Sequence, residues 1–109
     1  MKKAIVVTVL SACVCLFTGA GFAGEGAKGK SGEELYKEHC AVCHPDGGNI
    51  INPQKTLNKK ELDANKIKSA ADIVAKMRNP GPGMTKFDKK MISAGDAKKI
   101  ATYILNTFK

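Results

Sequence analysis

One short motif, residues 40–44 with the sequence CAVCH, constrains this chain more than any other feature. On a helical turn, the first residue of such a motif faces the same side as the residues three and four positions later. The thiols of Cys40 and Cys43 and the imidazole of His44 can therefore point at one object. The pattern Cys-x-x-Cys-His is typical of covalent haem attachment, in which each thiol adds to a vinyl group and the adjacent imidazole reaches the iron. We expect these three residues to hold one haem c with its iron.

Two other kinds of site use closely spaced cysteines, and the surrounding sequence favours neither. A thioredoxin-like Cys-x-x-Cys motif follows a strand and opens a helix, whereas residues 40–43 close a predicted helix. A zinc site needs two further ligands, and beyond the motif residues 24–109 offer only His39 and carboxylates. Adjacent residues on a helix point about 100° apart, so we expect His39 to face solvent.

The N-terminal residues predict an export signal. A lysine-containing start, a mostly apolar stretch over residues 4–17 and small residues before position 24 are typical of a cleaved signal peptide. The apolar stretch is too short to span a membrane. We expect residues 1–23 to be a signal peptide, residues 24–30 to be a flexible glycine-rich linker and residues 31–109 to be the single folded domain.

A second processing signal overlaps the first. Residues 10–13 (LSAC) resemble a lipoprotein box, in which Cys13 would be lipidated and become the N-terminus. The apolar run continues past Cys13, which favours ordinary cleavage. Ordinary cleavage predicts a periplasmic protein with no transmembrane span, whereas lipidation predicts the same domain anchored to a membrane surface through Cys13.

The hydrophobic pattern predicts an all-α domain of about four short helices. Ser31 with a glutamate three residues later is a capping box, and Ser69 and Ser93 each precede an aspartate by the same spacing. Apolar residues then recur at helical spacing, and no stretch alternates as a strand would. The first two expected helices cover residues 32–43 and residues 57–62. The third runs from Ser69 to a stop at residues 79–83. The fourth starts at Ser93, and its apolar face includes Tyr103, Ile104, Thr107 and Phe108.

A haem iron bound by one histidine needs a sixth ligand or keeps an open site. Three methionines fall in the predicted domain, at Met77, Met84 and Met91. Met84 is favoured because it follows residues 80–83 (PGPG), an irregular segment where the chain can bend over the second haem face. Met77 lies on a helical apolar stripe, which favours core packing, and Met91 is the weaker alternative.

Taken together, these stretches resemble the class I cytochromes c, most of all the cytochrome c6 subgroup and its monohaem bacterial relatives. The resemblance covers nearly all of residues 31–109. Four stretches carry it: the motif, residues 47–57 (GGNIINPQKTL), residues 83–87 (GMTKF) and residues 100–105 (IATYIL). The subgroup commonly has proline after its axial methionine, where this chain has Thr85.

The resemblance implies a small cytochrome c fold, with four short helices and loops wrapped around one covalent haem. In such proteins the first and last helices cross closely through glycine and aromatic residues, and here Gly32, Tyr36, Ile100 and Tyr103 fall at the matching offsets. The family also implies that the second ring N–H of the ligand histidine is donated to a backbone carbonyl, which it places near residues 52–53.

The expected function is that of an exported monohaem electron carrier. With His44 and Met84 as axial ligands no site is left for a substrate, so we expect one-electron transfer without enzymatic turnover. The alternative is a haem protein with an open or labile sixth site, a sensor or a peroxidase-like enzyme, since Thr85 constrains the methionine loop less than proline would. A thiol–disulfide redox protein is a third possibility.

The charge of the chain bears on its partners. The whole sequence has a formal net charge of +8, and loss of the two leader lysines would lower it to +6. Lysines flank both loops of the expected site, so we expect redox proteins with acidic docking faces as partners of a monomer. An exported protein is not expected to bind nucleic acid. The lysines concerned are Lys55, Lys59, Lys60, Lys86, Lys89 and Lys90.

Overall fold

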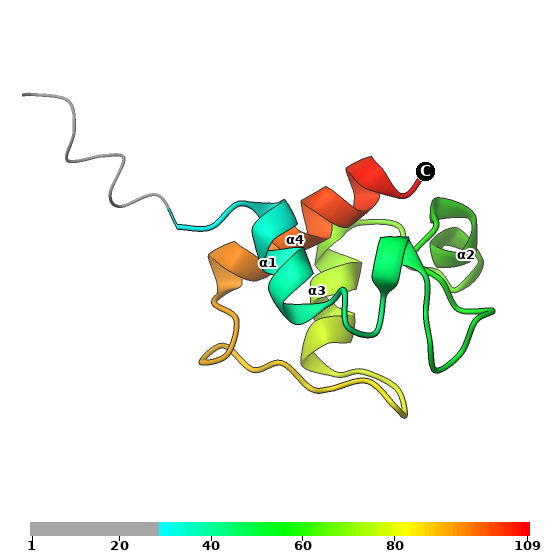
Figure 1. Cartoon of the computed structure of the whole chain (residues 1–109), viewed down its shortest axis with the longest axis horizontal. Coiled ribbons are helices and arrows are strands. Elements are labelled where there is room, and N and C mark those ends of the chain that lie inside the picture. The colour runs from blue at the N-terminus through cyan, green and yellow to red at the C-terminus, as the bar shows by residue number, and fades with distance from the viewer. Residues whose placement is uncertain (1–28) are drawn as a thin grey trace, which may run out of the picture.

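The computed structural model describes residues 29–109, and these residues are all-α (Figure 1). The predicted signal peptide, Cys13 and most of the predicted linker lie outside the described residues. Within the described part the chain forms no strand, and four α-helices confirm the predicted fold class. The elements are α1 (Gly32–His39), the 3-10 turn η1 (Pro45–Gly47), α2 (Lys59–Ala64), α3 (Ala70–Arg78) and α4 (Ala94–Thr107).

The helix starts lie where the capping residues predict them. The side chain of Ser31 accepts a hydrogen bond from the amide of Glu34, and the Glu34 carboxylate accepts one from the amide of Ser31. Ser69 and Asp72 make the same reciprocal pair at the start of α3. At the start of α4 the hydroxyl of Ser93 accepts a hydrogen bond from the amide of Asp96. Each cap satisfies amides that a helix start leaves unpaired.

Two of the expected helices have different bounds in the structure, each for a local reason. Helix α1 ends at His39 rather than residue 43, because the amides of Cys40 and Ala41 both bond the carbonyl of Tyr36 and this widened last turn ends the helix. Helix α2 starts two residues later than expected, because the side chain of Asn58 accepts from the amide of residue 60 and makes Asn58 the cap.

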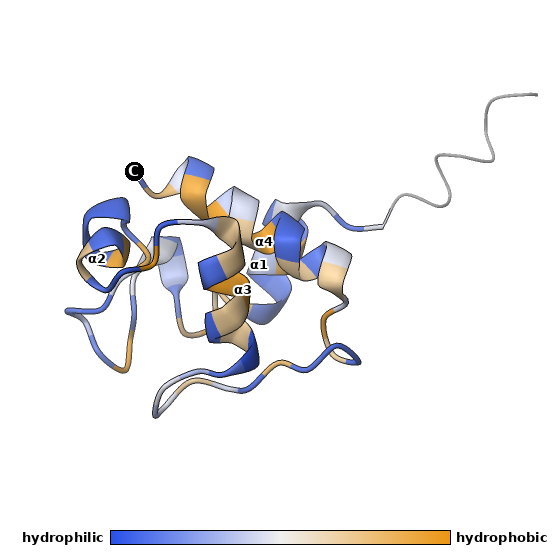
Figure 2. Cartoon of the chain, turned by 180° about the vertical axis from the view of Figure 1, so that it is seen from behind, coloured by the Kyte–Doolittle hydropathy of each residue, from blue (hydrophilic) through white to orange (hydrophobic). Residues whose placement is uncertain are grey.

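Helix α4 forms the centre of the fold and packs against both α1 and α3. Figure 2 shows hydrophobic orange and hydrophilic blue residues alternating along the ribbons of α3 and α4. A Cβ atom built on Gly32 of α1 would lie 2.4 Å from the carbonyl oxygen of Lys99 in α4, so only glycine permits this crossing. The predicted close approach of the first and last helices is therefore confirmed. The fully buried positions of α4 are Ala97, Ile100 and Ala101.

The loop between α3 and α4 also contributes to the core. Phe87 and Ile92 are buried, together with Met77 from α3, which confirms the predicted core role of Met77. Thr107, predicted on the apolar face of the last helix, is exposed instead. Among residues 29–109, no helix combines the length and the apolar character that crossing a membrane requires.

Candidate haem site

The motif forms a set of turns at the end of α1. The amide of His44 bonds the carbonyl of Cys40 at 2.8 Å, and the amide of Cys43 bonds the same carbonyl at 3.1 Å. The first of these bonds has the spacing of an α-helical turn, so residues 40, 43 and 44 stay neighbours although the helix has ended. The prediction that the motif lies on a regular helix is wrong, but one helix-like turn remains.

The two cysteines of the motif are free thiols with different surroundings. Cys40 is buried and belongs to the core, and Cys43 is half-buried. Burial raises the pKa of the Cys40 thiol to about 11. A thiol–disulfide redox centre needs a cysteine whose pKa is lowered, so the surroundings of Cys40 oppose that alternative.

The imidazole of His44 is oriented by the backbone. Its Nδ1 atom lies 2.7 Å from the carbonyl oxygen of Gly48. Because a carbonyl only accepts, Nδ1 carries a hydrogen, so in the neutral ring Nε2 is the nitrogen whose lone pair can bind a metal. The acceptor is Gly48, four residues beyond the histidine, and not a carbonyl near residues 52–53 as the resemblance implied. The turn η1 brings the Gly48 carbonyl back towards the ring.

A buried tyrosine reaches the same turn. The hydroxyl of Tyr36 donates to the carbonyl of His44 and accepts from the amide of Gly47 at 3.1 Å. Burial raises the pKa of Tyr36 to about 12, so the hydroxyl stays protonated at neutral pH. The resemblance implied that Tyr36 lies where the first and last helices cross, and its burial and its contact with the ring of Tyr103 in α4 agree with that. Nothing in the spacing could show where the hydroxyl would point.

The loop that carries Met84 is closed at its base. The amide of Phe87 bonds the carbonyl of Met77 at 2.9 Å, and Nη1 of Arg78 donates to the carbonyl of Phe87 at 3.0 Å. These bonds tie the far end of the loop to the end of α3. Arg78 was missed by the sequence analysis, because an arginine in the last turn of a helix is ordinarily explained by the helix dipole alone.

The methionine loop also touches the loop that follows the motif. Gly83 has a φ of 87°, which favours glycine, and a Cβ atom at Gly83 would lie 3.2 Å from Cγ2 of Ile51. Met84, directly after this glycine, is 36% exposed, whereas Met91 is 53% exposed. The fold therefore places the segment before Met84 beside the stretch that leaves the histidine motif.

The remaining histidine departs from its prediction. The ring of His39 lies edge-on to Phe87, with ring centroids 6.2 Å apart, and its side chain is only 25% exposed. It was expected to face solvent, but α1 turns this position towards the loop between α3 and α4. His39 does not join the motif.

These residues suit a covalent, largely apolar cofactor. Two free thiols and an imidazole with a free Nε2 lie within one turn, and Ile50 and Ile51 beside them are about 60% exposed. Large exposed apolar side chains of this kind are what an apolar ring would cover. The donor set and the apolar surroundings fit haem c.

Comparisons with known proteins agree with this fit. A family model described as cytochrome C oxidase, cbb3-type, subunit III, matches residues 27–104. Cytochrome c6 of Cyanidium caldarium is 33% identical over 106 residues, which cover 97% of this chain and 94% of that protein. Cytochrome c6 of Synechocystis is 41% identical over 75 residues, covering 69% of this chain and 62% of that protein.

Solved structures show the same similarity. OmcF, an outer membrane cytochrome from Geobacter sulfurreducens, is 47% identical, covers 72% of this chain and 100% of its own, and superposes with a TM-score of 0.71. Cytochrome c6C from Synechococcus is 25% identical and superposes with a TM-score of 0.67, covering 72% of this chain and 95% of its own.

Proposed function

Because this chain belongs to the class I cytochrome c family and is a monohaem electron carrier, we propose that His44 and Met84 are the axial ligands of its iron. The protein has one covalently bound haem c, and when bound this group supplies an iron that takes up and releases one electron. Cys40 and Cys43 would form the two thioether bonds. The single observation that carries the proposal is the 2.7 Å contact from His44 Nδ1 to the Gly48 carbonyl, which leaves Nε2 free to bind.

Met84 is the proposed sixth ligand for three reasons. It follows a left-handed glycine in a loop whose base is fixed by Arg78 and Phe87. That loop contacts Ile51, which lies beyond the motif. Met77, in contrast, is 3% exposed and packs in the core, so its thioether is already enclosed by protein side chains.

The two ligands have consequences for the potential. A thioether is a soft ligand that favours the reduced iron, and a hydrogen bond to the histidine fixes the ring and tunes its basicity. Two filled axial positions leave no place for a substrate, so the protein transfers one electron at a time without turnover.

Replacement of Met84 by alanine tests this assignment. The Met84→Ala protein should lose the thioether-to-iron absorption band of the ferric state, bind carbon monoxide when reduced, and have a lower reduction potential, since a soft ligand is lost. Met91→Ala is the matched control and should keep the band, because Met91 lies after the loop and is more exposed. A band that survives in Met84→Ala and disappears in Met91→Ala would reverse the assignment. Ready carbon monoxide binding by the unmodified protein would favour the open-site alternative.

The basic surface suits acidic redox partners. Lys86, Lys89 and Lys90 are exposed and follow Met84 along the chain, and Lys55 is exposed in the loop after the motif. Lys59 forms an ion pair with Asp63 at 2.9 Å, which reduces its effect on a partner. Charges of one sign around a redox site raise association rates with oppositely charged partners, mostly at low salt.

A charge variant measures this effect. The triple change of Lys86, Lys89 and Lys90 to glutamine should slow oxidation of the reduced protein by the anionic ferricyanide ion at low ionic strength, and the difference should shrink at high salt. If the variant and the wild type are oxidised at equal rates at both salt concentrations, these lysines do not steer the partner.

Export to the periplasm is proposed from residues 1–23, and the domain is proposed to act as a monomer. Lipidation of Cys13 is the alternative, and the name of the Geobacter relative, an outer membrane cytochrome, is the observation that favours it. N-terminal sequencing of protein from an exporting host separates the two, since ordinary cleavage gives a start near Gly24 and lipidation gives a modified Cys13.

A further inference from the structure

We propose that the hydroxyl of Tyr36 is a positioning group for the axial imidazole, because it holds the turn that carries the hydrogen-bond acceptor of His44. The inference rests on the proposed role of His44 as a ligand. The resemblance named this side chain only for the crossing of the first and last helices, and the inference gives its hydroxyl a role that a phenylalanine could not fill.

The hydroxyl joins both ends of one turn. It donates to the carbonyl of His44 and accepts from the amide of Gly47, which also lies 3.2 Å from that carbonyl. Gly48 follows directly, and its carbonyl accepts the Nδ1 hydrogen of His44 at 2.7 Å. A shift of the turn would therefore move the acceptor relative to the ring.

The turn needs such support because its backbone is unfavourable. Asp46 has a φ of 51° and Gly47 a φ of 77°, so two consecutive residues are left-handed. Glycine adopts this conformation freely, but a residue with a Cβ atom pays a conformational penalty and keeps it only where its surroundings fix it. The amide of Gly48 bonds the Pro45 carbonyl at 2.9 Å, and the amide of Leu57 bonds the Gly47 carbonyl at 2.7 Å. The Tyr36 hydroxyl adds two side-chain hydrogen bonds to the same turn from the core.

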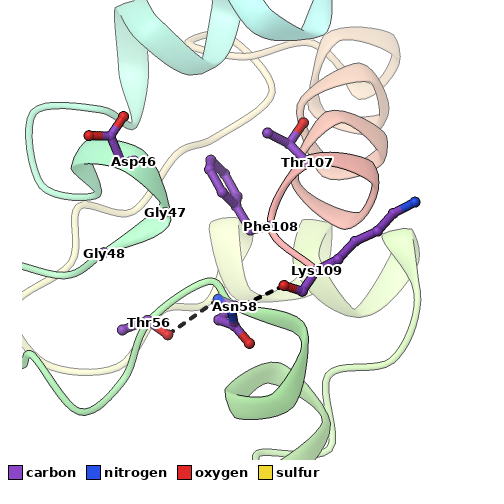
Figure 3. A pocket seen from close by; sticks show the side chains of 8 residues that line it. All are labelled: Asp46, Gly47, Gly48, Thr56, Asn58, Thr107, Phe108 and Lys109. Carbon is purple, nitrogen blue, oxygen red and sulfur yellow. Dashed lines mark hydrogen bonds between the residues drawn. The ribbon is translucent and has the colours of Figure 1, made fainter.

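The ring that carries the hydroxyl is itself fixed. Tyr36 is 3% exposed, and its ring centroid lies 5.2 Å from that of Tyr103 and 5.4 Å from that of Phe108. Phe108 in turn lies against Gly47, where a Cβ atom would approach its ring to 2.6 Å. Figure 3 shows the Phe108 side chain pointing between α4 and this turn. Phenylalanine at position 36 would keep this packing and remove only the two hydrogen bonds.

The variant Tyr36→Phe, in the full haem-loaded protein, tests the inference. NMR of the reduced protein would measure solvent exchange of the Gly47 amide and of the His44 Nδ1 hydrogen. A typical internal hydrogen bond contributes modestly to stability, so we expect both exchange rates to rise about three- to tenfold. Tyr103→Phe is the matched control: the ring of Tyr103 packs on that of Tyr36, but within residues 29–109 its hydroxyl makes no hydrogen bond to the turn, so this variant should exchange both hydrogens at the wild-type rate.

The outcomes separate this inference from the proposed function. If Tyr36→Phe folds, keeps the thioether band and exchanges both hydrogens at the wild-type rate, the hydroxyl positions nothing and the inference is wrong. If the unmodified protein shows no iron-bound histidine, the ligand assignment itself fails, whatever Tyr36 does. The first result comes from the Tyr36→Phe variant and the second from the unmodified protein, so the two failures are distinguishable.

A second variant covers the case in which Tyr36→Phe does not load haem. Asp46→Gly removes the left-handed penalty from the turn, so the double variant Tyr36→Phe with Asp46→Gly should load haem again. If the double variant does not load haem while Asp46→Gly alone loads it normally, the inference is wrong. Removal of the backbone penalty at position 46 would then not compensate for the missing hydroxyl.

Discussion

The core role of Met77 predicts that its replacement by alanine lowers stability while leaving the iron ligands in place. Only 3% of this residue is exposed, so nearly the whole side chain leaves water on folding. Full burial of a methionine side chain is worth about 1.5–3 kcal/mol, and the cavity left by alanine adds to the loss. The helix propensities of methionine and alanine are similar, so α3 itself is little affected.

We therefore expect Met77→Ala to lower the free energy of unfolding by about 2–5 kcal/mol. In a domain of this size, a loss of about 2 kcal/mol already lowers the melting temperature by at least about 8 °C. The bond from the Phe87 amide to the Met77 carbonyl is a backbone contact that alanine can also make, so the base of the methionine loop should survive.

Guanidinium unfolding followed by far-ultraviolet circular dichroism measures the stability, and the ferric thioether band of the same sample reports ligation. Met91→Ala is the control, because a half-exposed side chain away from the core should change stability by no more than about 0.5 kcal/mol. A Met77→Ala protein that lost its ligation band, with a stability loss under about 1 kcal/mol, would refute the reasoning. Met77 would then be a ligand and not part of the core.

Three further perturbations test the helices. Gly32→Ala should lower stability by about 1–3 kcal/mol, because the new Cβ atom would clash with a carbonyl of α4. Gly95→Ala is the control and should be neutral or stabilising, because a Cβ atom there meets nothing within 4 Å. Thermal unfolding distinguishes the two variants. Ser69→Ala should lower stability by about 1 kcal/mol, since it removes the cap of α3, and the loss is measurable by denaturant unfolding; an unchanged midpoint would contradict the capping assignment. Hydrogen bonds from the backbone amide of Lys68, and then from Ser69, lower the pKa of Asp72 below its usual value. The stabilising effect of the Asp72 carboxylate should therefore be complete above the usual aspartate pKa of about 3.9. It should be lost as the pH falls through the lower pKa that this carboxylate has in the folded protein. The melting-temperature difference between the wild type and Asp72→Asn should be constant near neutral pH and shrink below about pH 4, and a difference that grew instead would contradict this sign.

The sequence was sufficient for the parts of this protein that depend on neighbours along the chain. The Ser-x-x-acid pairs at Ser31 and Ser69 predicted the helix starts, because a cap and its helix lie within four residues of each other. The motif at residues 40–44 predicted the haem, because the chemistry of attachment needs those residue types at that spacing. Helical periodicity placed Met77 in the core for the same local reason.

The end of α1 shows where local reasoning failed. Apolar residues at helical spacing suited a helix over residues 32–43, but α1 ends at His39 and residues 45–48 fold back to the histidine. The turn at residues 45–48 is stabilised by the Tyr36 hydroxyl and by the Phe108 ring at the other end of the chain. Periodicity carries no information about such contacts.

The site needed the tertiary structure for the same reason. The sequence could name His44 and Met84, but the carbonyl that orients the histidine proved to be that of Gly48, and the loop of Met84 is closed by Arg78 and Phe87. Each of these contacts joins a side chain or amide to a backbone carbonyl. Every residue presents the same carbonyl group, so the sequence cannot mark which one is chosen; the path of the chain in space decides it.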